Sequence, residues 1–160
     1  MQLLASEEYG LRCLLRVAAA GAGAPLPVAE VARSEGLSPD YAAKLLRQLR
    51  LAGLVESVRG TAGGYVLARP AAQISVWGAL EALGGAFFDA DFCSCHPGQR
   101  QRCVRTRDCS LRPLWLRLQA TLRRSLEGVS LCDLQRDEDS MAAWLDAAGH
   151  DLIRIQGATT

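Results

Sequence analysis

The stretch PVAEVARSEGLSPDYAAKLLRQLRLAGLVESVRGTAGGYVLARP, residues 27–70, decides the fold of this chain. Its first part predicts two short helices, 28–35 and 39–52, separated by a turn at Gly36. Ser38 is placed to cap the second helix, because its hydroxyl can accept a hydrogen bond from a free backbone N–H there. Two helices at this spacing are typical of a helix-turn-helix, although similar αα-hairpins also occur in helical bundles.

Two β-prone runs, 54–58 and 65–68, follow at once and flank the glycine-rich sequence RGTAGG. They predict a β-hairpin, and a hairpin directly after a helix-turn-helix makes a winged helix. Arg59, at the base of this wing, is placed to enter a minor groove or meet a phosphate, and Gly60 allows a close backbone approach. The alternative is an ordinary tight hairpin with a solvated arginine. The sequence therefore predicts a mainly α fold with a small β-hairpin wing, and the candidate DNA-contacting residues are Ser38, Tyr41, Lys44, Arg47, Arg59 and Gly60.

A second stretch, FCSCHPGQRQRCVRTRDCSLRPLW at residues 92–115, contains four of the six cysteines of the chain. Their spacing is Cys93-x-Cys95-x7-Cys103-x5-Cys109. The segment up to Cys109 lacks apolar periodicity, so we expect a loop that packing alone does not order. Thiolates bind iron and zinc strongly, and metal binding can supply the missing ordering energy. Four loop cysteines therefore favour an iron-sulfur cluster or a structural zinc ion; a metal-free redox thiol set and incidental cysteines are the alternatives.

The sequence after this loop predicts a long helix over residues 110–127, with an apolar seam at spacings of three and four residues. A single helix cannot bury such a seam alone, so the pattern predicts a homodimer. Further helices are expected over 3–20, 74–83 and 141–147. The segment VSLCDL is expected to fold back onto the core, with Cys132, like Cys13, packed as a small apolar residue. The residues of the seam are Leu111, Leu114, Trp115, Leu118, Leu122 and Leu126.

The whole chain has 160 residues, of which 49% are hydrophobic, and this is enough for one core with an extended second element. We expect a winged-helix DNA-binding domain at 1–70, then a connecting helix, cysteine loop and dimerisation helix at 71–134, and an acidic tail at 135–160. No apolar run reaches about 18 residues and no signal-peptide pattern is seen, so we expect a cytoplasmic protein with no membrane association. The sequence contains no recognisable Ser/His/Asp set, phosphate-binding loop or paired-carboxylate pattern, so we do not expect an enzyme.

Several of these stretches together carry a family resemblance. They are YGLRCLL at residues 9–15, the run 37–70, ISVWGALEAL at 74–83, and the cysteine loop ending in CSLRPLW. Over residues 1–134 the chain resembles the winged-helix regulator family that includes the iron-sulfur regulator IscR and the nitric-oxide sensor NsrR. The resemblance implies a dimer formed through the long helix, binding to palindromic promoter operators in double-stranded DNA, and a 2Fe-2S or 4Fe-4S cluster on three loop cysteines and a fourth ligand.

The chain also departs from the family pattern, and the departures fall on the ligands. Cys103 and Cys109 are in the family's register, whereas Cys93 and Cys95 compete for the remaining cysteine position. Arg112 stands where IscR has a histidine ligand, and a guanidinium cannot ligate. Cys95 or His96 could close the site from within the loop. Glu8 is similar in position to the acidic residue that NsrR contributes from the partner subunit, and we favour three cysteines with a non-cysteine ligand of this kind.

One further departure lies in the second helix of the helix-turn-helix. Ala43 stands where IscR has a carboxylate that reads a base, so the resemblance does not extend to the operator sequence. The expected metal ligands are therefore drawn from Cys93, Cys95, Cys103, Cys109 and Glu8, around an iron-sulfur cluster, with zinc as the alternative.

Overall fold

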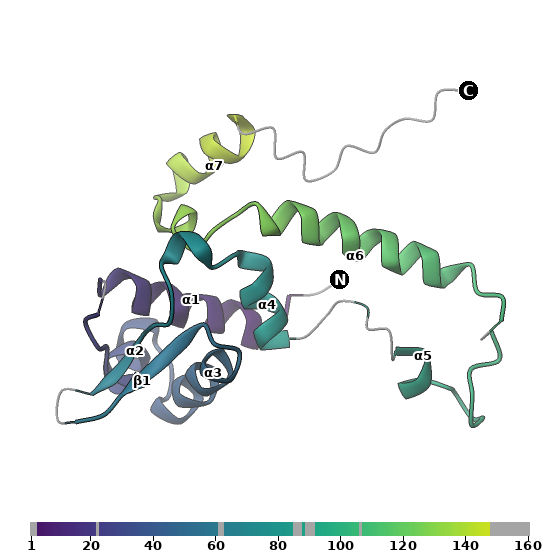
Figure 1. Ribbon diagram of the computed structural model, residues 1–160, viewed down its shortest axis with the longest axis horizontal. Helices are drawn as coiled ribbons and strands as arrows, with labels where there is room; N and C mark the ends of the chain where they lie inside the picture. Colours follow the sequence, from purple (N-terminus) through teal and green to yellow (C-terminus); the bar gives the residue numbers. More distant parts are fainter. Residues whose placement is uncertain are drawn as a thin grey trace. The chain divides into compact units, whose positions relative to one another are not determined.

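The computed structural model describes residues 3–21, 23–60, 63–84, 88, 92–105 and 107–147 (Figure 1). These residues form two compact units. The first holds the described residues up to Gly84 together with those from Leu126 onward, and the second holds those from Phe88 to Ser125. Among the described residues, no helix is long and apolar enough to cross a membrane.

The first unit is a winged helix. Its elements in chain order are α1 (Ala5–Ala19), α2 (Val28–Glu35), α3 (Pro39–Leu51), β1 (Val55–Val58), β2 (Gly64–Leu67), the 3-10 turn η1 (Ala71–Gln73), α4 (Val76–Gly84), η2 (Asp133–Gln135) and α7 (Glu138–Ala147). The two strands are antiparallel, with Val55 opposite Leu67 and Val58 opposite Gly64. Figure 1 shows β1 next to α3, so the hairpin directly follows and contacts the second helix of the helix-turn-helix. The predicted mainly helical fold with a small wing is confirmed.

The turn between α2 and α3 follows from its local sequence. Gly36 ends α2 with a φ of 66°, a left-handed backbone conformation that glycine adopts without strain. Ser38 then caps α3, because its hydroxyl oxygen accepts a hydrogen bond from the Tyr41 N–H at 3.3 Å. Pro39 occupies the first turn of α3, where its missing N–H costs nothing. These residues set the angle between the two helices.

The core of the first unit is built on α1, which contacts α2, α3, α4 and β2. Gly10 lets α1 approach α4 closely, because a side chain at this position would collide with Leu83. Cys13 is fully buried, as predicted for a packed apolar residue. The largest fully buried side chains of the core are Cys13, Leu14, Val17, Val31, Leu45, Leu46, Leu49, Val55, Ile74 and Leu131.

The segment after α6 folds back onto this core, as predicted. The N–H of Leu131 donates to the Ile74 carbonyl at 2.8 Å, and the N–H of Val76 donates to the Val129 carbonyl at 2.9 Å. Extended backbone alternates its side chains, so Val129 and Leu131 point inward. The prediction that Cys132 is packed is wrong: it is exposed, because it follows an inward-facing residue at the start of the η2 turn.

The second unit contains α5 (Phe92–Cys95) and the greater part of α6 (Leu111–Glu127). The predicted helix over 110–127 is confirmed by α6, whereas the predicted loop begins with one helical turn, α5, that the sequence analysis did not anticipate. Among the described side chains of α6 none is buried, and its leucines are largely open. Leu111 is 50% exposed, Leu114 54% and Leu118 37%.

Candidate DNA interface and cysteine loop

The candidate recognition helix is α3, which presents two different faces. Its buried face consists of Ala42, Leu45, Leu46 and Leu49. Lys44 and Arg47 lie on the exposed surface of the same helix. A helix that is anchored on one side and carries cations on the other can enter a major groove without losing its packing.

Two of the predicted contact residues at the start of α3 already have structural roles. The Ser38 hydroxyl is the helix cap described above, although the residue itself is exposed. Tyr41 is half-buried, and its ring packs edge to face on Tyr9 with the centroids 6.2 Å apart. Tyr41 therefore links the start of α3 to α1, and any contact with DNA would come from the part that stays exposed.

The wing places Arg59 and Gly60 on the surface, directly after β1. Gly60 has a φ of 121°, which a side chain would strain. Gly64 at the start of β2 leaves room for the connection between α1 and α2, because a side chain there would collide with the Leu26 backbone. Leu26 and Tyr65 exchange two backbone hydrogen bonds of 2.9 Å. The wing is thus fixed to the body of the unit through the start of β2.

An ion-pair cluster joins α1 to the end of α2, and the sequence analysis missed it. Glu35 accepts from Arg12 Nε at 2.8 Å and lies 3.4 Å from Arg16 Nε. Arg12 also donates to the Glu35 backbone carbonyl at 3.2 Å and lies over the Tyr9 ring. The hydrogen bond to Glu35 raises the pKa of Arg12, and the charge of Glu8 adds to that rise. The only sequence signal was the spacing of the two arginines, which puts them on one side of a helix.

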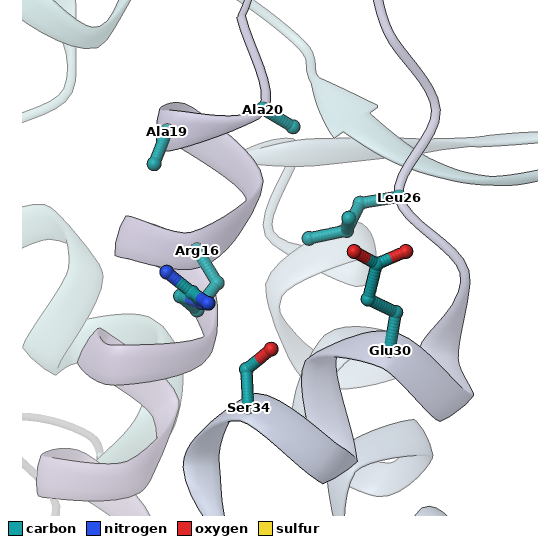
Figure 2. A pocket seen from close by; sticks show the side chains of 6 residues that line it. All are labelled: Arg16, Ala19, Ala20, Leu26, Glu30 and Ser34. Carbon is teal, nitrogen blue, oxygen red and sulfur yellow. The ribbon is translucent and has the colours of Figure 1, made fainter.

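A hollow lies beside this cluster, between the end of α1 and α2 (Figure 2). Figure 2 shows Arg16 on one side and Glu30 on the other, with Ser34 between them. The remaining lining residues are Ala19, Ala20 and Leu26. Its volume of about 180 Å³ is below the range of roughly 300–1,000 Å³ that is usual for small-molecule sites. The hollow therefore gives no support for a ligand-binding role.

None of the four predicted loop ligands, all of them among the described residues, forms a disulfide. Cys93, Cys103 and Cys109 are half-buried, and Cys95 is exposed. In the described part of the chain, no three His, Cys, Asp or Glu side chains come together as a metal site. Glu8 is exposed on α1, in the first unit, whereas the four cysteines belong to the second. As a donor set, four cysteines on one loop fit an iron-sulfur cluster or zinc, which both take cysteine ligands.

His96 directly follows α5 and is oriented by it. Its Nδ1 lies 3.0 Å from the Phe92 carbonyl oxygen, and its ring stacks on the Phe92 ring at a centroid distance of 4.3 Å. A carbonyl only accepts, so this contact places the ring proton on Nδ1 and leaves the lone pair on Nε2. Metal-binding histidines are commonly held by such a second hydrogen bond. This orientation leaves Nε2 as the His96 atom that is available to a ligand.

The two cysteines outside the loop differ from each other in chemistry. Burial raises the pKa of the Cys13 thiol to about 11, so this residue stays protonated and unreactive at neutral pH. Cys132 is exposed and lies in the first unit. These two thiols are useful comparisons for the four in the loop.

Three comparisons with known proteins agree on the family. Residues 4–137 match the Rrf2 family, described as an iron-dependent transcriptional regulator. The HTH-type transcriptional regulator IscR of Vibrio atlanticus (strain LGP32) is 32% identical over 139 residues, which cover 87% of this chain and 78% of that protein. The structure of CymR from B. subtilis, the global cysteine regulator, superimposes with a TM-score of 0.65 at 27% identity, over 86% of this chain and 99% of that one. The T. potens IscR structure also gives a TM-score of 0.65, at 26% identity, covering 89% and 90% of the two chains.

Proposed function

Since the chain belongs to the Rrf2 family of transcriptional regulators, we propose that it is a homodimeric DNA-binding regulator whose cysteine loop holds an iron-sulfur cluster as the sensing group. Members of this family are regulators, so the chain is a DNA-binding transcriptional regulator and not an enzyme. Our proposal concerns three further features: which residues contact DNA, how the homodimer forms, and which group acts as the sensor.

The DNA interface is formed by α3 and the wing. The observation that carries this part of the proposal is the placement of Lys44 and Arg47 on the open surface of α3, with Arg59 on the wing that directly follows. A helix of this kind lies in a major groove, and the wing then reaches the adjacent minor groove or its phosphates. Ala43 offers only a methyl group to a base edge, which can contact thymine but cannot accept from cytosine.

Dimerisation takes place through α6. Its seam carries leucines of which Leu111 and Leu114 are at least half exposed, and this apolar surface needs a partner. A second copy of the chain presents the same seam, so the two helices can pack against each other around a two-fold axis. A symmetric dimer explains how two recognition helices engage a palindromic operator.

The sensing group is an iron-sulfur cluster bound by Cys103, Cys109 and one or both of Cys93 and Cys95. The family's description as iron-dependent and the similarity to IscR support this choice of group. When bound, a cluster supplies a redox-active and oxidant-sensitive centre whose loss would release the loop that it orders. If only one of Cys93 and Cys95 ligates, the fourth ligand is Glu8 of the partner subunit, or alternatively His96, whose Nε2 lies away from the contact with Phe92.

The second candidate is a metal-free thiol switch in the same loop. It is favoured by the likeness to CymR, which is described as a cysteine regulator, and by the partial exposure of the four cysteines. A structural zinc ion is the third possibility for the same donor set.

Purification without oxygen separates these three. A cluster gives visible absorption and matched iron and acid-labile sulfide, zinc gives a colourless protein with metal, and a thiol switch gives neither. The DNA-binding part is tested independently, by selecting a duplex from a random-sequence pool with the purified protein. Failure to enrich any sequence would contradict the proposed function as a whole.

A further inference from the structure

The strongest unassigned feature is a concavity between α3 and the hairpin, lined by two arginines that the mechanism proposed above does not use. It has a volume of about 590 Å³ and lies where the end of α3 meets β1 and the residues after β2. Two exposed arginines line it, Arg50 in the last turn of α3 and Arg69 after β2. The remaining lining residues are Gly53, Val55, Glu56, Ser57 and Ala68.

Both arginines are available for a partner. Within the described residues, the side chain of neither Arg50 nor Arg69 forms a hydrogen bond or an ion pair, whereas the side chains of Arg12 and Arg16 are engaged by Glu35. Glu56, the one acidic residue of the concavity, has no such bond to either of them. Two unpaired guanidinium groups and the Ser57 hydroxyl at one surface depression form a donor set for an anion with several oxygens.

The concavity is continuous with the proposed DNA contacts on both sides. Arg50 is three residues after Arg47, so the two lie next to each other on α3. Ser57 lies on β1, and Arg59 follows the end of this strand two residues later. Val58 pairs with Gly64 at the far end of β1, and Arg69 lies at the opposite end of the hairpin. The depression therefore extends from the recognition helix along the wing.

This position determines which anion it meets. If α3 lies in a major groove and the wing reaches the adjacent minor groove, the sugar-phosphate strand that separates the two grooves passes between them. The concavity lined by Arg50 and Arg69 lies on this surface between α3 and the wing. Arginine contacts to phosphate supply affinity and fix the register on the duplex without reading sequence.

We infer that Arg50 and Arg69 form a clamp for the DNA phosphate backbone between the major-groove contacts of α3 and the minor-groove contacts of the wing. This inference rests on the proposed DNA-binding function and adds a second set of contacts to it. Glu56 opposes the clamp, since a carboxylate in the same depression repels the phosphates. The clamp sets affinity and register, and it leaves the choice of sequence to α3.

The test measures the salt dependence of binding to the duplex selected by the wild-type protein. Arg50→Gln and Arg69→Gln should each weaken binding several-fold and reduce the slope of log K against log salt. The reduction is about 0.9 for each phosphate contact removed, and therefore about twice that for a dimer. Arg50→Lys and Arg69→Lys should restore most of the slope, because the positive charge is kept. Glu56→Gln should tighten binding.

The matched control is Arg124→Gln, which removes one exposed arginine from α6 and changes the net charge equally. It should leave the slope unchanged, and thermal unfolding of each variant checks that the fold is kept. A wild-type slope in either Arg50→Gln or Arg69→Gln, or an equal loss in Arg124→Gln, overturns the clamp. In that case Arg59→Ala still reports on the proposed DNA interface, whereas a wild-type protein that selects no duplex overturns the proposed function itself.

Discussion

Arg12 Nε donates to the Glu35 carboxylate over 2.8 Å, and this contact joins the first helix of the chain to the last residue of α2. The Glu35 side chain is only 12% exposed, and it also faces Arg16. The helix-turn-helix is therefore held to α1 by charge as well as by its apolar face. Because little water reaches this carboxylate, its charge is stabilised by the two arginines.

Glu35→Ala should destabilise the fold by about 1 kcal/mol, because it removes the carboxylate that two arginines share, while water rehydrates these arginines, which are 40% and 49% exposed. The free energy of unfolding in urea measures the change. Glu30→Ala is the matched control: it removes an exposed carboxylate from the same helix and should stay within about 0.5 kcal/mol of the wild type. Equal effects of the two substitutions would show that the ion-pair cluster contributes nothing specific.

The fold could be predicted because its decisive residues act locally. Gly36, Ser38 and the glycines of the wing each dictate their own backbone, and the apolar spacing of α3 selects the buried face. The ion pair of Arg12 and Glu35 could not be predicted in this way, because 23 residues separate them and the local sequence around one residue does not indicate contact with the other. Cys132 was misplaced because the residue type suggested burial, whereas the alternation around Leu131 decided its direction.

The cysteine loop shows the opposite situation. Its residue types predict a metal site, yet no periodic pattern fixes the positions of Cys93, Cys95, Cys103 and Cys109 relative to one another. When a loop depends on a bound group for its order, the positions of its residues are set by that group and not by the local sequence. The turn of helix at Phe92–Cys95 and its stacking against His96 are the ordered features there that apolar spacing did not reveal.

Acid should weaken the turn that returns the chain to the core. A hydrogen bond from Ser130, with a second from Arg136, lowers the pKa of Asp133 from 3.8 to about 2. The ionised form is thus favoured in the folded state, so the stabilisation is present above about pH 4 and is lost as the pH falls towards 2. The wild type should be more stable than Asp133→Asn at pH 6, by about 1–2 kcal/mol, and this advantage should shrink between pH 4 and pH 2.

The control for this pH dependence is Asp146→Asn, since Asp146 is an exposed carboxylate of α7. Its difference from the wild type should stay constant over the same range. A constant difference for Asp133→Asn as well would mean that the hydrogen bonds of Asp133 do not contribute to stability.

Arg59→Ala should weaken operator binding by about 1–3 kcal/mol if the guanidinium contacts a base edge. If it meets only a phosphate, the loss is smaller and is accompanied by a lower salt slope. Arg47→Ala should show a comparable loss, because it removes a cation from the exposed surface of α3. Fluorescence anisotropy with the selected duplex distinguishes the two cases for Arg59, and unchanged affinity together with an unchanged slope would remove this residue from the interface.

Charges placed in the seam of α6 should separate the proposed dimer. The double substitution Leu118→Glu with Leu122→Glu puts four carboxylates into the dimer interface, and repulsion and desolvation both oppose association. Light scattering should report a monomer, and operator affinity should fall because two half-sites are no longer engaged together. Arg117→Glu, an exposed position of the same helix outside the seam, should remain dimeric. A dimer in the double mutant would place the interface elsewhere.

The ligand set can be resolved by single substitutions in protein purified without oxygen. Cys103→Ala and Cys109→Ala should each abolish iron and sulfide retention and the visible absorption, since no spare thiol stands at these positions. Cys132→Ala is the matched control: it removes an exposed cysteine outside the loop and should retain the full cluster.

If all four loop cysteines ligate, Cys93→Ala and Cys95→Ala will lose iron equally and Glu8→Ala will leave the spectrum intact. If three ligate, one of these two cysteine variants will be silent, and the identity of the remaining ligand follows from comparing Glu8→Ala with His96→Ala. Glu8→Ala should then make the cluster labile, whereas a labile cluster in His96→Ala alone would assign the site to the Nε2 atom that the Phe92 carbonyl leaves open. Full iron retention in both Cys103→Ala and Cys109→Ala would exclude a cluster on this loop and leave the thiol switch or structural zinc as the explanation of its four cysteines.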